Sequence, residues 1–182
     1  PRRRIELLLL DRTDSANGYA SAVPYPAIVL FITAPQEDSS LGTYDEWAPT
    51  ILSHELTHVL HMDTNHGIVQ AARWVVGRVA STNEGSPGWI TEGQATLQET
   101  WHSTGGRGRS AMVDMIIRTS IIEDDFPPLG NMDGAQPDPP AGNLRYLFGM
   151  DFMRFVADET GRAVWTRWNH TYGSSIPFIL PS

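Results

Sequence analysis

The segment Ile51–His61, read as ILSHELTHVLH, constrains the fold of this chain more than any other stretch. Apolar residues lie around most of its circumference in a helical projection, which predicts a buried α-helix. In that helix His54 and His58 lie on one face about 6 Å apart along the axis, and Glu55 is turned about 100° from His54. Burying these polar groups without partners costs several kcal/mol, and a metal ion supplies the missing partner. The segment therefore predicts a metal site at His54 and His58, with Glu55 beside it as a base.

A third ligand for this metal is expected from another part of the chain. His61 lies seven residues after His54 on nearly the same face, but about 10.5 Å further along the axis. The ligand atoms of a tetrahedral zinc lie only about 3.4 Å apart. We therefore expect His61 to support the site or to form part of its wall. Asp63 and His66 follow too soon to return to the metal unless the chain reverses sharply.

A second predicted helix carries a candidate carboxylate. Ser86-Pro87 forms a favourable N-cap and first-turn pair, which predicts a helix that continues to about His102. Glu92 lies on this helix, away from its apolar stripe. The neighbouring Gly93 and Ala95 are small, and we expect them to let this helix approach the histidine helix closely. The alternative is that Glu92 is a solvated side chain on an exposed face.

The order of the elements predicts the fold class. Two apolar runs, Arg4–Leu10 and Ala27–Thr33, predict β-strands, with the turn dipeptide Asn17-Gly18 between them. Helical patterns follow over about 43–62, 67–79, 86–102, 110–122, 144–160 and 163–172, and a Thr43-x-x-Glu46 capping box is expected to open the first of them. Strands followed by helices predict an α+β fold. We expect one domain over 1–182, with a small N-terminal twisted sheet and the histidine helix over about 1–64 and a mainly helical subdomain over about 65–182.

Composition narrows the classes of partner. The net charge of −8 disfavours a nucleic-acid partner, and Gly105–Arg109 (GGRGR) lacks the Lys-Ser/Thr of a P-loop, so we expect a simple turn there. The absence of cysteine excludes disulfides and thiolate zinc ligands. No apolar run reaches about 18 residues, so no transmembrane segment is expected. Because the chain begins with Pro1 and ends on the apolar Ile176–Ser182, we expect it to be part of a longer protein with further C-terminal domains.

The motifs HELTH and WITEGQA together resemble the gluzincins, zinc peptidases built on His-Glu-x-x-His and a downstream glutamate. Within that group the chain looks like the bacterial peptidase-MA-like domains. The segments DRTDSANGYA, YDEW, GRGR and YLFGMDFMRFVADETG also resemble that group, so the resemblance covers most of the chain. It implies a zincin-like fold and a zinc metalloendopeptidase whose Zn²⁺ ligands are His54, His58 and Glu92. It also implies that the Glu84-Gly85 pair does not supply the third ligand.

Two features depart from the gluzincin pattern. The 33 residues between His58 and Glu92 exceed the spacer of thermolysin-type enzymes. Thr96 stands where those enzymes place a carboxylate that supports a ligand histidine. The group that supports the ligands here stays open between three residues, Glu99, Asp63 and His61.

The resemblance further implies a mechanism. Glu55 is expected to take a proton from zinc-activated water, and Tyr146 to face the tetrahedral oxyanion as a hydrogen-bond donor. The alternative for Tyr146 is simple core packing, and His170 and Tyr172 are the next candidates for the donor. We expect Ala27–Thr33 to be the edge strand to which an extended peptide or protein substrate adds.

A second hypothesis is a zinc-binding module without hydrolytic activity, in a larger cell-envelope or secreted protein. Glu55 argues against it, because a structural zinc usually fills its fourth position with protein and needs no base. A third hypothesis, a metalloprotease associated with nucleic acid, is disfavoured by the acidic balance. From the resemblance alone, the protein is expected to be secreted, periplasmic or associated with the cell envelope.

Overall fold

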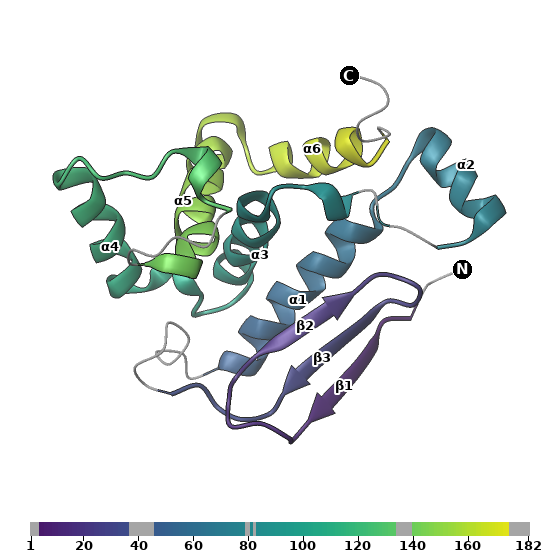
Figure 1. Ribbon diagram of the computed structural model, residues 1–182, viewed down its shortest axis with the longest axis horizontal. Coiled ribbons are helices and arrows are strands. Elements are labelled where there is room, and N and C mark those ends of the chain that lie inside the picture. Colours follow the sequence, from purple (N-terminus) through teal and green to yellow (C-terminus); the bar gives the residue numbers. More distant parts are fainter. Residues whose placement is uncertain (1–3, 37–45, 79–80, 82, 134–139, 175–182) are drawn as a thin grey trace.

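The computed structural model describes residues 4–36, 46–78, 81, 83–133 and 140–174. Within these residues the chain forms three β-strands and then six α-helices (Figure 1). The prediction of an α+β chain with a small sheet before the helices is confirmed. The expected capping residue Thr43 and the apolar end Ile176–Ser182 lie outside the described residues. None of the described helices is long and apolar enough to span a bilayer.

The sheet has the strand order β1-β3-β2. β1 (Glu6–Leu10) runs parallel to β3 (Ala27–Phe31), and β2 (Gly18–Ser21) runs antiparallel to β3. β3 is therefore the central strand, and the expectation that Ala27–Thr33 is an edge strand is wrong. The edge next to α1 is β2, whose sequence GYAS is too short and too polar to be predicted as a strand.

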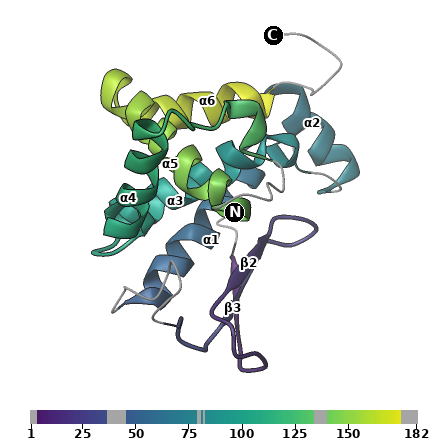
Figure 2. The same ribbon diagram turned by 60° about the vertical axis from the view of Figure 1, so that its left-hand side comes forward.

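Helix α1 (Trp47–Asp63) lies between the sheet and the other helices (Figure 1 and Figure 2). It packs on β2 and β3 through an apolar cluster that includes Ile28 and Ile51, and on α3 through another face. The sheet and α3 leave Leu56 and Leu60 partly open to solvent, at 37% and 58% exposure. The expectation that α1 is buried around most of its circumference is therefore wrong on that side.

The remaining helix ends follow the local signals closely. Helix α5 (Leu144–Thr160) has the predicted bounds, and α4 (Ala111–Ile122) differs from them by one residue. Helix α3 (Gly88–His102) begins one residue later than expected, with Pro87 as its N-cap residue. Helices α2 (Gly67–Val76) and α6 (Ala163–Ser174) differ from their predicted bounds by two or three residues at their C-terminal ends.

Helices α3 and α5 approach each other closely through two glycines. A Cβ atom on Gly93 would lie 2.6 Å from the carbonyl carbon of Gly149, and one on Gly149 would lie 2.5 Å from the carbonyl oxygen of Trp89. Neither position has room for a side chain. The small residue Gly93 thus serves the contact with α5, and the expectation that it serves contact with the histidine helix is wrong.

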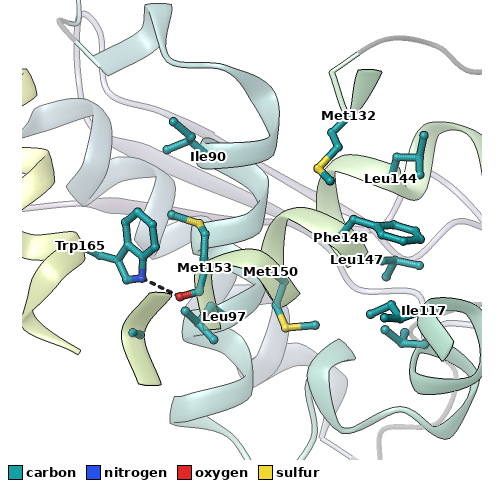
Figure 3. Close-up of a cluster of buried hydrophobic side chains, with 12 residues drawn as sticks. Ile90, Leu97, Ile117, Met132, Leu144, Leu147, Phe148, Met150, Met153 and Trp165 are labelled. Carbon is teal, nitrogen blue, oxygen red and sulfur yellow. Dashed lines mark hydrogen bonds between the residues drawn. The ribbon is translucent and has the colours of Figure 1, made fainter. Parts of the chain in front are cut away.

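The larger apolar core surrounds this helix pair (Figure 3). Helix α4 contributes Val113 and Ile117, and α6 contributes Trp165. The indole Nε1 of Trp165 donates a hydrogen bond of 3.0 Å to the carbonyl oxygen of Met153, which satisfies this buried polar group. The core therefore fixes α3 and α5, the two helices that carry Glu92 and Tyr146.

Candidate metal centre

Three side chains from two helices converge on one point. His54 and His58 lie four residues apart on α1, and Glu92 lies in the second turn of α3. The distance is 3.1 Å between the two histidine Nε2 atoms and 3.2 Å from each of them to Oε2 of Glu92. Ligand atoms of a tetrahedral zinc lie about 3.4 Å apart. These three residues are the one group of histidines and carboxylates within the described part of the chain that could hold a metal ion.

The hydrogen bond made by Nδ1 of His54 determines which of the two ring nitrogens carries the proton. Nδ1 of His54 lies 3.0 Å from Oε2 of Glu99, and an ionised carboxylate only accepts hydrogen bonds, so Nδ1 carries the proton. In the neutral form of the ring, the lone pair on Nε2 of His54 then faces Glu92 and His58. Lone pairs at this separation repel one another unless a cation lies between them. The donor set therefore fits a metal ion.

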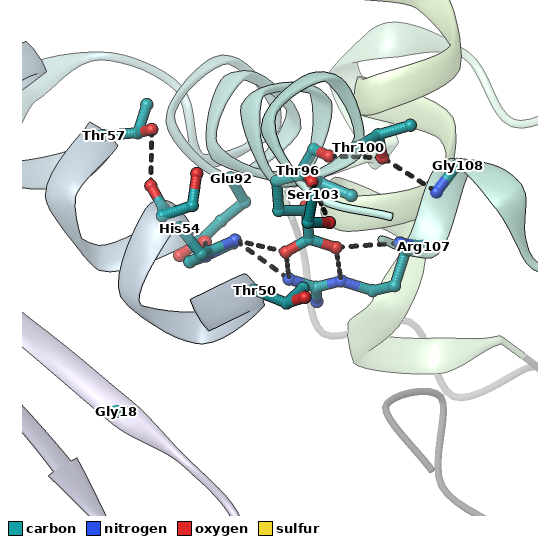
Figure 4. Close-up of polar contacts among 12 residues, drawn as sticks. Gly18, Thr50, His54, Thr57, Glu92, Thr96, Thr100, Ser103, Arg107 and Gly108 are labelled. Carbon is teal, nitrogen blue, oxygen red and sulfur yellow. Dashed lines mark hydrogen bonds and ion pairs between the residues drawn. The ribbon is translucent and has the colours of Figure 1, made fainter. Parts of the chain in front are cut away.

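Arg107 lies next to His54 and also binds Glu99; Figure 4 shows Arg107 and His54. Its Nε and backbone N–H each donate to Oε1 of Glu99 at 2.9 Å, and its NH2 donates to Oε2 at 2.8 Å. The same NH2 lies 3.0 Å from Nδ1 of His54, because both groups point a hydrogen at Oε2, which is the stronger acceptor. Glu99 and Arg107 are 1% and 7% exposed, so this ion pair is buried behind the cluster.

The pKa values of these groups follow from burial and from charge. Burial opposes ionisation of Glu92, but without a metal ion the hydrogen bonds that protonated His54 and His58 donate outweigh it and hold the Glu92 pKa well below its usual value. Burial also opposes ionisation of Glu99, and the charge of Arg107 overcomes it and lowers the pKa to about 2. Burial alone would lower the pKa of His54, whereas hydrogen bonds to Glu92 and Glu99 raise it. The field at the cluster thus attracts a cation.

Glu55 lies in the same cavity as the three convergent side chains. The residue is 5% exposed, and burial raises the pKa of its carboxyl group above the usual value. Strand β2 covers it, because a Cβ atom on Gly18 would lie 3.1 Å from Cγ of Glu55 and 2.8 Å from Cδ2 of Leu30. The absence of a side chain at Gly18 therefore lets the sheet close over this carboxyl group.

Tyr146 also faces the cavity, from the first turn of α5. Its ring is stacked on that of His54, with ring centroids 6.1 Å apart, and the guanidinium of Arg107 lies 4.7 Å from the Tyr146 ring centroid. Burial raises the pKa of its hydroxyl group. The two other candidates for this place point elsewhere: His170 stacks on His66, and Tyr172 stacks on Trp168.

A cavity of about 490 Å³ joins these groups. Helices α1, α3 and α5 each contribute to its lining, as does the turn that carries Arg107. The segment that leads into and forms β2 closes one side of it, with Ala16, Asn17, Gly18, Tyr19 and Ala20. The cavity is thus bordered by the edge strand β2 and not by β3.

Of the three residues that could support a ligand histidine, the structure places only Glu99 against one, His54. Glu99 contacts His54, whereas Asp63 forms ion pairs with Arg73 and Arg78. His61 lines a different pocket of the molecule. The hydroxyl of Thr96 has no hydrogen-bond partner among the described residues.

Arg107 is the residue of the site that the sequence did not predict. Its segment forms the expected turn, a 3₁₀ turn over Arg107–Arg109, but the side chain is buried in the site and is not part of a simple surface turn. In the sequence, an arginine among glycines soon after the helix that carries Glu99 is only a weak indication of a site residue. The contact between Arg107 and Glu99 is seen only in the fold. The side chain of Glu84 lies outside the described residues, so its exclusion as a ligand stays a prediction.

Comparison of the chain with protein-family models, with curated proteins and with solved structures finds no match. The functional argument therefore depends on the residues of the cavity themselves.

Proposed function

We propose that this protein is a zinc-dependent peptide-bond hydrolase, a metalloendopeptidase of the gluzincin type with a zincin-like fold. The observation that carries the proposal is the convergence of His54 Nε2, His58 Nε2 and Glu92 Oε2 within 3.2 Å of one another, with Glu55 in the same cavity. Two imidazoles and one carboxylate are the ligand set of catalytic zinc sites, which keep a fourth position open. Zinc held by His54, His58 and Glu92 would supply a Lewis acid for the peptide carbonyl and would lower the pKa of water to about 7.

Glu55 is the general base of this proposal. Its buried carboxyl group has a raised pKa, which brings it closer to neutral pH and makes it a better proton acceptor than an exposed glutamate. It takes a proton from the attacking water and passes the proton to the leaving amine. The cover provided by Gly18 and β2 keeps this carboxyl group out of bulk solvent.

Tyr146 is the proposed donor to the oxyanion. Its raised pKa keeps the phenol protonated, so the hydroxyl group can donate a hydrogen bond at neutral pH. The ring packs against both His54 and Arg107, which supports its place beside the proposed metal ligands.

The proposed substrate is an extended peptide or protein segment that pairs with β2. Among the described strands, β2 pairs only with β3, and residues of β2 line the cavity. A peptide added to this edge would bring its backbone past Glu55 and the metal ligands, with hydrogen bonds to the strand supplying affinity. This replaces β3, the strand that the sequence suggested. The resemblance to the peptidase-MA-like domains supports a secreted, periplasmic or cell-envelope location, and no nucleic-acid partner is proposed.

The test compares the parent protein with Glu55→Gln. Metal content is measured by elemental analysis, and hydrolysis is measured on casein and on a peptide library, with and without a zinc chelator. We expect one zinc per chain in both proteins, chelator-sensitive hydrolysis in the parent, and a rate lower by about 10²–10⁴-fold in Glu55→Gln.

The outcomes separate the candidate functions. Zinc at one per chain without hydrolysis of any substrate in the parent would favour the non-hydrolytic module. Activity that survives in Glu55→Gln would contradict the assignment of the base. A parent protein that binds no zinc would contradict the metal centre itself.

A further inference from the structure

A second pocket lies on a different face of α1. Helices α1, α3 and α6 enclose a groove of about 650 Å³, here named the α1–α3–α6 groove. Its α1 side includes Leu56 and Leu60, which are 37% and 58% exposed, together with Ser53 and Thr57. Each of Ser53 and Thr57 directly precedes one of the proposed metal ligands, so the groove and the metal centre share α1 but not their residues.

The groove carries no formal charge. Its lining consists of fourteen described residues, none of which is aspartate, glutamate, lysine or arginine, in a protein of net charge −8. Its polar groups are hydroxyls, carboxamides and imidazoles. The wall is apolar along α1, where Pro49 and Leu52 continue the side formed by the two leucines. A charged ligand would find no carboxylate, ammonium or guanidinium partner in this lining, whereas an uncharged ligand needs none.

Three buried residues of the lining have polar atoms without hydrogen-bond partners among the described residues. They are His61 (both ring nitrogens), Gln94 (Oε1) and Asn169 (Oδ1), one from each of the three helices. Their exposed fractions are 2%, 6% and 8%. Polar groups buried this deeply are normally paired, and these atoms have almost no exposed surface of their own, so a ligand in the groove pairs with them where the three side chains turn toward it.

The chemistry of these atoms sets the head group of the ligand. Burial lowers the pKa of His61 to about 4, so its ring is neutral and offers one donor and one acceptor. The two carboxamide oxygens of Gln94 and Asn169 are acceptors. Among these unpaired atoms, acceptors therefore outnumber donors. The complementary head group is uncharged, carries at least two N–H or O–H donors and has one acceptor.

We propose that the α1–α3–α6 groove binds an uncharged organic molecule with an aliphatic body and a head group rich in hydrogen-bond donors, of which a primary carboxamide is the simplest. The aliphatic body lies against Leu56 and Leu60, and the head group forms hydrogen bonds with His61, Gln94 and Asn169 as their side chains turn toward the groove. This site goes beyond the proposed hydrolytic function, because none of these five residues is a proposed ligand, base or oxyanion donor.

The experiment uses three probes of matched shape on the zinc-loaded chain, or on the chain as purified if it holds no zinc. They are 4-methylpentanamide, the isosteric ketone 5-methylhexan-2-one, in which a methyl group replaces the amide nitrogen, and sodium 4-methylpentanoate. Binding is measured by two-dimensional amide NMR titration. Each neutral hydrogen bond contributes about fivefold in affinity, so we expect the ketone to bind about 25-fold more weakly than the amide. The carboxylate is expected to bind more weakly than the amide as well, because its charge is not compensated.

Two variants locate the binding. Leu60→Gln changes an exposed residue of the groove wall, and Ile121→Gln changes a residue of similar exposure, 60%, on α4 outside the groove. We expect Leu60→Gln to weaken amide binding severalfold and Ile121→Gln to leave it unchanged. Asn169→Leu removes one acceptor and is expected to reduce the preference for the amide over the ketone about fivefold.

The proposal is overturned by any of three results. The first is equal affinity for the amide and the ketone, which would mean that the buried acceptors do not contact the head group. The second is equal weakening by Leu60→Gln and Ile121→Gln. The third is no binding of any probe at its solubility limit, which would leave ordered water as the partner of the buried atoms. Because these results are read from NMR and not from hydrolysis, they are independent of the outcome for Glu55→Gln.

Discussion

Glu99 joins two buried groups, His54 and Arg107, so replacing it with glutamine tests the proposed metal centre through the residue that supports His54. Its carboxylate accepts a hydrogen bond from His54 Nδ1 at 3.0 Å and three from Arg107, at 2.8 and 2.9 Å. Every described atom that forms a hydrogen bond with this carboxylate is therefore a donor. In Glu99→Gln one of the two acceptor oxygens becomes an NH2 group, which must face at least one of these donors.

The expected effects differ for the two partners of Glu99. A carboxylate that fixes a ligand histidine contributes about 10–100-fold to metal affinity, so we expect zinc binding to weaken by that factor. Arg107, at 7% exposure, loses its counter-charge in a buried setting. Removing one partner of a buried ion pair costs about 3–5 kcal/mol, so the free energy of unfolding of the metal-free protein should fall by that amount.

The matched control is Asp114→Asn on α4. Asp114 forms an ion pair of 2.7 Å with Arg118, but the two side chains are 60% and 73% exposed. Loss of such a surface pair costs about 0.5 kcal/mol or less. Zinc affinity is measured by competition with a chromophoric chelator, and stability by urea unfolding at neutral pH with and without zinc. A Glu99→Gln protein that binds zinc within twofold of the parent, or that loses no more stability than Asp114→Asn, would refute the reasoning.

Two further predictions concern stability. Gly149→Ala places a Cβ atom 2.5 Å from the Trp89 carbonyl oxygen and should cost about 1–3 kcal/mol or more in urea unfolding, whereas Gly142→Ala, with no atom within 4 Å, should change stability by about 0.5 kcal/mol or less. The pKa of His61 is lowered to about 4 from 6.5, so the unfolded state takes up a proton there at a higher pH than the folded state. The contribution of neutral His61 to the free energy of unfolding is fully present above pH 6.5. It falls by about 3 kcal/mol as the pH decreases from 6.5 to 4. Metal-free His61→Gln should therefore lose less stability than the metal-free parent between pH 6.5 and 4; parallel curves would contradict the depressed pKa.

Local patterns were sufficient for most helices. The bounds of α5 agree with the prediction because an apolar periodicity runs from Leu144 and Gly161 follows the last helical residue. The strand β2 was missed because Gly18–Ser21 has no apolar alternation of its own. It is a strand because it pairs with β3 and covers Glu55, and a pairing partner distant in the chain leaves no mark in a four-residue sequence.

The site likewise has one part that the sequence predicts and another that depends on the packing of the helices. His54 and His58 were placed together by helix geometry alone, since their spacing of four residues fixes their relation. The position of Glu92 against them, and the choice of Glu99 over Asp63 as the support of His54, depend on how α3 packs on α1. Packing between helices is set by side chains spread along both, and residue spacing does not encode it.

Arg107 shows why the parts of this cavity depend on one another. Its guanidinium bonds Glu99, which fixes His54, and lies over the ring of Tyr146, the proposed oxyanion donor. The positions of His54 on α1, a proposed metal ligand, and of Tyr146 on α5 thus depend on one side chain from the turn after α3. Burying an arginine is favourable only with a carboxylate partner, and Glu99 provides it on α3, which also carries Glu92. A single buried ion pair therefore supports both His54, one of the proposed metal ligands, and Tyr146, which is why the sequence motif alone, with two histidines and a base, leaves the proposed site incompletely specified.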